Sequence, residues 1–191
     1  MTSSVSARPV RATSRLLPSV LFAAYLLVLV WGVLWKFGVP DVSGEGVRAV
    51  KLVPFVASEG FGVSNPSEML ANVVLFVPFG VYLAILAPRW RWWRVAAVVA
   101  SASVALEVTQ YVLAVGSSDV TDVILNTTGA VCGMVVLALM RRRMGARAVP
   151  VALWVCGIAT AVVLLGAAAL LGSPFHVGPG HGGTGHLPRL R

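Results

Sequence analysis

The sequence predicts an all-α fold, a polytopic transmembrane bundle of about five helices. Of its 191 residues, 58% are hydrophobic and only 12% are charged, whereas a soluble domain has about 45–50% apolar and about 25% charged residues. The apolar residues gather in long blocks with short basic stretches between them. Because the arginines flank these blocks, the net charge of +8 indicates topology signals and contacts with anionic lipid, and no nucleic-acid partner is expected.

Five blocks are long enough to cross a hydrocarbon core, which needs about 20 apolar residues. A basic segment precedes the first block, but its apolar stretch exceeds the roughly 7–15 residues of a secretory signal peptide, and no A-x-A site follows. We therefore expect a retained first helix. The predicted spans are 16–37, 70–88, 95–115, 120–140 and 149–171.

The distribution of basic residues predicts the orientation. Ten of the 15 lie in segments on one side of the predicted spans and five on the other. The side with more arginines is cytoplasmic by the positive-inside rule. We therefore expect a multi-pass protein of the bacterial plasma membrane with its N-terminus inside and its C-terminus outside. It would comprise a basic N-terminus (1–15), the bundle (16–171) and a flexible tail rich in Gly, Pro and His (172–191).

No cofactor or metal site is predicted. The tail contains His176, His181 and His186, but a glycine-rich segment provides no helix or strand to fix their geometry. Cys132 and Cys156 fall inside apolar blocks without metal-ligand spacing. We expect both thiols to be small hydrophobic groups.

The second span contains a polar and small-residue face. Asn72, Phe76 and Gly80 recur every four residues, so they share one side of a helix. Gly80 allows another backbone to come close. Pro78 cannot donate to the carbonyl of Val74, so a neighbouring group is expected to satisfy that acceptor.

The third and fourth spans contain a longer polar stripe. Only a short link around 116–118 joins them, which predicts an antiparallel helical hairpin. Folding about this link would set Gln110 near Asp122 and Glu107 near Asn126, forming a polar seam that opens outward and that Asn72 joins. The stripe consists of Glu107 and Gln110 on the third span and Asp119, Asp122, Asn126, Gly129 and Gly133 on the fourth.

Glu107 and Asp122 are the strongest functional candidates. A charged residue at mid-membrane costs about 2.5–3.5 kcal/mol, and no Lys or Arg lies within the predicted spans apart from Lys36 at the outer end of the first. Each acid therefore needs a proton, a cation, a polar ligand or a basic residue of the outer loop, such as Arg48 or Lys51. For Asn72 and Asn126 taken singly, hydrogen bonding between helices is a sufficient explanation.

These motifs resemble the VanZ-like family of bacterial membrane proteins, whose founding member is associated with low-level teicoplanin resistance. The resemblance covers about 50–140 and includes the segment Lys51–Phe55. It implies an envelope-associated role without supplying a reaction. Where the family commonly has an arginine and an asparagine, this sequence has Gly116 and Lys51, which makes Arg48 or Lys51 the candidate partner of the aspartates.

Three functions are consistent with the seam. The leading hypothesis is a non-enzymatic protein that binds an envelope lipid or a lipid-linked, wall-related ligand and contributes to glycopeptide (teicoplanin) tolerance. An intramembrane enzyme would use Glu107 and Asp122 as an acid–base pair, although no Ser–His, Cys–His or HExxH set is present. A proton- or cation-coupled transporter would also use intramembrane acids, but the sequence lacks the internal repeats common in such proteins.

Overall fold

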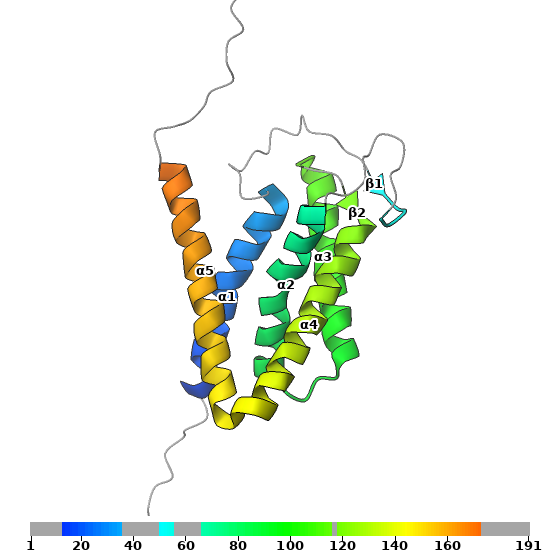
Figure 1. Cartoon of the computed structure of the whole chain (residues 1–191). Helices are drawn as coiled ribbons and strands as arrows, with labels where there is room; N and C mark the ends of the chain where they lie inside the picture. The colour runs from blue at the N-terminus through cyan, green and yellow to red at the C-terminus, as the bar shows by residue number, and fades with distance from the viewer. Residues whose placement is uncertain (1–12, 36–49, 56–65, 116–117, 173–191) are drawn as a thin grey trace, which may run out of the picture.

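The computed structural model describes residues 13–35, 50–55, 66–115 and 118–172. The histidine tail and Arg48 lie outside these ranges. The described residues form five α-helices, one short 3-10 helix and one pair of two-residue strands (Figure 1). In chain order they are α1 (Thr13–Trp35), β1 (Val50–Lys51), α2 (Pro66–Leu86), α3 (Trp92–Leu113), β2 (Ser118–Asp119), α4 (Val120–Met144), η1 (Gly145–Arg147) and α5 (Ala148–Gly172).

The predicted all-α transmembrane fold is confirmed. Four continuous helical stretches are long and apolar enough to cross a membrane, and the fourth, Val120–Gly166, has 47 residues. A single crossing needs only about 20. The chain reverses at η1 within that stretch (Figure 1), so it contains two antiparallel helices, α4 and α5, and the described part of the bundle makes five passes.

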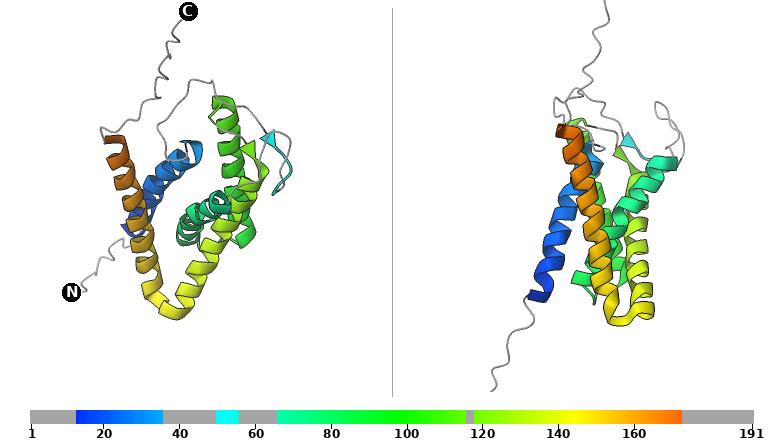
Figure 2. Two further views of the ribbon diagram at one scale, coloured as in Figure 1. Left: turned by 45° about the horizontal axis from the view of Figure 1, so that its top comes forward. Right: turned by 60° about the vertical axis from the view of Figure 1, so that its left-hand side comes forward.

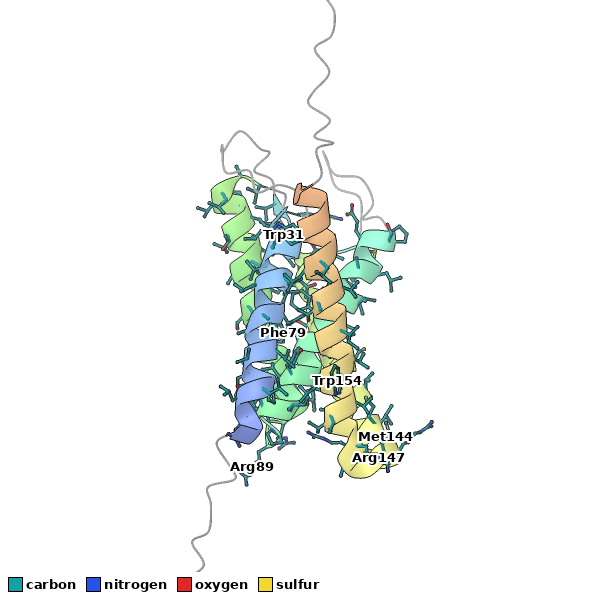
Figure 3. All side chains as sticks on the ribbon, turned by 90° about the vertical axis from the view of Figure 1, so that its left-hand side faces the viewer. Trp31, Phe79, Arg89, Met144, Arg147 and Trp154 are labelled. Atoms are coloured by element: carbon teal, nitrogen blue, oxygen red, sulfur yellow. The ribbon has the colours of Figure 1, made fainter. Side chains whose placement is uncertain are left out.

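The arginines of the described loops gather at one end of the bundle. Arg89 and Arg147 lie at this end, and Trp31 lies toward the other (Figure 3). In the last turn of α4, Arg141, Arg142 and Arg143 complement the negative end of the helix dipole. By the positive-inside rule this is the cytoplasmic end, and the opposite end is called the outer end below.

The helices form two groups (Figure 2). Helices α2, α3 and α4 pack together, and α1 and α5 lie side by side next to them. Helices α2 and α4 both run from the outer end to the cytoplasmic end and are therefore parallel, whereas α3 runs the opposite way (Figure 1). The antiparallel hairpin predicted for the third and fourth spans is thus α3 and α4.

Glycines bring α2 and α4 into backbone contact. A Cβ atom built on Gly80 would overlap the carbonyl oxygen of Ala130, and one on Gly133 would overlap that of Val77. Gly129 meets the carbonyl of Val73 in the same way. Because lipid supplies no hydrophobic force between helices, such close approach is a main source of their association. The close approach of another backbone that Gly80 predicts is present. Gly80 meets α4, and Gly129 and Gly133 meet α2.

Pro78 interrupts α2 where α1 crosses it. The hydroxyl of Tyr25, which is buried in α1, donates a hydrogen bond to the carbonyl of Leu75 at 2.5 Å. The carbonyl that receives this side chain is that of Leu75, one residue after the Val74 carbonyl that the sequence indicated.

We predict that Gly133→Ala destabilises the protein by about 1–3 kcal/mol or more, the usual cost of overpacking, because the new methyl group meets the rigid carbonyl of Val77. The midpoint of thermal unfolding in detergent measures the effect. Gly166→Ala is the matched control: its Cβ would have no neighbour within 4 Å, and alanine stabilises a helix by up to about 1 kcal/mol relative to glycine. Equal losses of stability in both variants would contradict the assigned α2–α4 contact.

Candidate outer polar site

The chain reverses between α3 and α4 through a tight, partly non-helical link. After Leu113, Ala114 adopts a left-handed conformation (φ 53°, ψ 37°), and its N–H bonds to the carbonyls of Gln110 and Tyr111. This conformation usually belongs to glycine, and an alanine there costs about 1–2 kcal/mol. Helix α4 then begins at Val120, and its N-cap residue is Asp119.

The outer segment 50–55 docks on this link. Strand β1 pairs with β2 in parallel, with Val50 beside Ser118 and Lys51 beside Asp119. The backbone N–H of Phe55 donates to the hydroxyl of Thr121 at 3.2 Å. These contacts place the side chain of Lys51 inside the protein, where only 3% of it is exposed.

Lys51 forms an ion pair with Asp119. Its Nζ lies 3.2 Å from Oδ2 of Asp119, which confirms that an outer-loop cation reaches an acid of the stripe. The other oxygen, Oδ1, accepts the N–H of Thr121 at 2.8 Å, the standard N-cap bond. Burial alone would raise the pKa of Asp119, but the hydrogen bonds from Thr121 and the ammonium of Lys51 outweigh it and hold that pKa below its ordinary value.

Glu107 of α3 is joined to the same link. Its Oε2 accepts the backbone N–H of Asp119 at 2.9 Å, and its carbonyl accepts the hydroxyl of Ser118 at 2.8 Å. Only 7% of Glu107 is exposed. The carboxyl group is therefore fixed at the mouth of the hairpin by the same Asp119 that pairs with Lys51.

Helix α2 contributes the remaining contact. Asn72 donates from Nδ2 to Oδ1 of Asp122 at 2.7 Å. Asn72, Phe76 and Gly80 all face α4, as their four-residue spacing predicts. We call the five residues at this end the outer polar cluster: Lys51, Asn72, Glu107, Asp119 and Asp122.

Two of the predicted pairs, Gln110 with Asp122 and Glu107 with Asn126, are wrong. Gln110 instead donates to the carbonyl of Val33 in α1 at 2.8 Å, and Asn126 donates to the hydroxyl of Ser103 at 2.8 Å. The prediction let α4 start directly after a three-residue link. Because the turn at Ala114 and strand β2 lengthen the link, each residue of α4 meets α3 about one helical turn away from the expected position.

A groove of about 300 Å³ lies beside the cluster, between α3 and α4. Glu107, Ser118 and Asp119 lie along its edge, but almost all of its accessible wall is apolar. Its other walls are apolar or aromatic, and they are provided by Val50, Val104, Val108, Tyr111, Val120 and Val123. We call it the outer groove. It is an apolar channel with the fixed carboxyl group of Glu107 at its edge, and such a channel suits the apolar part of an amphiphilic molecule.

Comparison with known proteins agrees with the motif resemblance. The family model described as VanZ/LLP1 matches residues 22–141. Protein VanZ from Enterococcus faecium is 33% identical over 147 residues, which cover 76% of this chain and 88% of that protein. The chain belongs to the VanZ/LLP1 family. It is thus a VanZ-like membrane protein of a family linked to glycopeptide resistance. No solved structure matches it.

Three polar residues of this VanZ-like protein escaped the sequence reasoning. Ser103, Ser118 and Thr121 are buried and bond to predicted residues. Ser103 lies four residues before Glu107 and therefore on the same helix face, and Thr121 lies at N2 after an aspartate, as in an N-cap. Both of these spacings can be read from the sequence. The burial of Ser118 depends on the pairing of β1 with β2, for which two-residue strands give no periodic signal.

We predict that Lys51→Met destabilises this VanZ-like protein by about 3–5 kcal/mol, because it leaves Asp119 buried without its cation. The double variant Lys51→Met/Asp119→Asn should regain most of that loss, since asparagine keeps the N-cap function. Thermal unfolding of the four proteins in detergent gives the coupling energy. If the destabilisation of the double variant equals the sum of the destabilisations of the two single variants, the ion pair contributes no coupling energy.

Acid should remove the contribution of Asp119. Because its folded-state pKa is depressed, its stabilisation is fully present above the unfolded pKa of about 3.9 and is lost as pH falls through the lower folded-state value. The difference in unfolding midpoint between the wild type and Asp119→Asn should be constant from pH 7 to about pH 5 and shrink below about pH 4. A difference that grows on acidification would contradict the assigned sign.

Proposed function

We propose that this protein resides in the bacterial plasma membrane and binds an envelope lipid or a wall-related ligand in its outer groove, through which it contributes to teicoplanin tolerance. The observation that supports the proposal most is the position of Glu107. A carboxyl group is fixed at the edge of an apolar groove at the outer end, where envelope components meet the membrane.

The hydrogen bonding of Glu107 suits a ligand. Oε2 accepts the N–H of Asp119, and the side chain of Ser118 also donates toward this carboxyl group. A carboxylate has about four acceptor positions, so two donors leave room for a hydroxyl, amide or ammonium group. Such groups are common in lipid headgroups and wall precursors, so Glu107 offers the polar head of an amphiphile a hydrogen-bond partner.

The apolar walls support the same ligand class. Valines from β1, α3 and α4 surround the carboxyl group, and Tyr111 borders it one turn away on α3. An acyl or prenyl chain bound in the outer groove would contact these valines in place of the surrounding lipid. Because Val50 belongs to the docked outer segment, the ion pair between Lys51 and Asp119 also shapes the wall of the groove.

Glu107→Gln tests the proposal with little change of shape, because a glutamine oxygen still accepts the N–H of Asp119 while the carboxyl group is removed. In a teicoplanin-sensitive host that produces the chain, we expect this variant to lower tolerance to the level of cells with an empty vector. Minimum inhibitory concentrations, measured at equal amounts of protein in the membrane fraction, provide the readout.

Glu68→Gln is the matched control. Glu68 is an exposed acid in the first turn of α2 and does not line the outer groove. Its substitution should leave tolerance unchanged. Wild-type tolerance in the Glu107→Gln cells, or no tolerance conferred by the wild-type chain, would contradict the proposal.

A further inference from the structure

A second groove lies between α1 and α5, on the opposite side of the bundle from the outer groove. It has a volume of about 480 Å³, and we call it the inner groove. Helix α5 forms most of it, from Val149 to Ala161, and α1 closes the other wall with Leu17 and Leu21. Trp154 lies on this part of α5 (Figure 3). All its lining residues are apolar or aromatic.

A glycine forms the floor of the inner groove. At Gly157 a Cβ would reach only ordinary contact with Leu21, at 3.7 Å. The two helices therefore approach each other there without interlocking, and a narrow channel remains between them. A flexible hydrocarbon chain fits such a channel better than a branched side chain does.

The length of the inner groove matches one leaflet. The twelve residue steps from Val149 to Ala161, at about 1.5 Å each, give about 18 Å. Half of a hydrocarbon core of about 30 Å is about 15 Å. Since Val149 follows the cytoplasmic turn directly, the groove spans the inner leaflet.

Two arginines lie at the cytoplasmic ends of the helices that form the inner groove. Arg15 is in the first turn of α1 and Arg147 directly precedes α5, and both are exposed. The described acids lie elsewhere. Glu68, Asp119 and Asp122 lie at the outer ends of α2 and α4, and Glu107 bonds to the link between α3 and α4. Among the described residues, no acid is therefore present at these helix ends to neutralise the arginines.

We propose that the inner groove binds an anionic phospholipid of the inner leaflet, with its phosphate between Arg15 and Arg147 and one acyl chain along Leu21 and Gly157. Arginine pairs with phosphate through two parallel hydrogen bonds, and basic pockets between helices on the cytoplasmic side suit anionic headgroups. A second copy of the chain fits less well, because its own arginines would meet these two at the same depth. This site is independent of the outer groove.

Native mass spectrometry of the full-length protein in detergent tests the proposal. The protein is titrated with dioleoyl phosphatidylglycerol or with dioleoyl phosphatidylcholine, and retained lipid is counted on the intact ion. We expect one phosphatidylglycerol to be retained in preference to phosphatidylcholine. Arg15→Gln/Arg147→Gln should weaken its retention at least ten-fold, since each basic residue near a membrane surface contributes about five-fold.

Arg89→Gln/Arg91→Gln is the matched control, because it removes two exposed arginines from the same end of the bundle but from the α2–α3 loop. It should retain the lipid as the wild type does. Ala161→Phe, which fills the inner groove from an exposed position, should lower retention with all arginines present. Three results would overturn the proposal. They are equal retention of both lipids by the wild type, an equal loss of phosphatidylglycerol retention in the two arginine double variants, and a lipid-free dimer as the main species.

Discussion

The ion pair between Lys51 and Asp119 determines how the outer end of this protein is built. A lysine that is only 3% exposed requires a partner, because an unpaired buried charge costs several kcal/mol. Asp119 meets that requirement, and its other oxygen caps α4. One carboxylate therefore fixes both the outer segment and the start of a helix. Its backbone N–H also holds Glu107, so the position of the candidate ligand-binding acid depends on the same residue.

Backbone contact between α2 and α4 complements this polar arrangement. The glycines at 80, 129 and 133 let the two parallel helices approach until a carbonyl meets each glycine. At the outer end of the same interface, Asn72 reaches Asp122. Because helices in lipid associate through close packing and hydrogen bonds, the two features support each other. The packing sets the distance, and the hydrogen bond sets the alignment along the helix axis.

Much of this could be predicted from the sequence because periodicity and the cost of membrane burial are strong constraints. Apolar block lengths predicted five passes, and the four-residue spacing of Asn72, Phe76 and Gly80 predicted that the three share one helix face, which the structure places against α4. The absence of any cation from the interior of the spans pointed to a loop residue such as Lys51. The register of α3 on α4 could not be predicted, since it depends on Ala114 adopting a conformation that usually signals glycine. The carbonyl of Val33 that receives Gln110 belongs to a helix 77 positions away, and local patterns contain no information about such a pairing.

The pairing of β1 with β2 is the most direct test of this account, because it delivers Lys51 to Asp119. In a background with Cys132 and Cys156 replaced, Val50→Cys and Ser118→Cys should form a disulfide in native membranes. Partners on neighbouring strands lie about 4.8 Å apart, within the range of about 4.4–6.8 Å that a disulfide requires. Val50→Cys with Leu139→Cys should not link, since Leu139 lies near the cytoplasmic end of α4. A fast Val50–Ser118 cross-link is the predicted result; its absence under oxidation that links other neighbouring pairs would contradict the docked position of the outer segment.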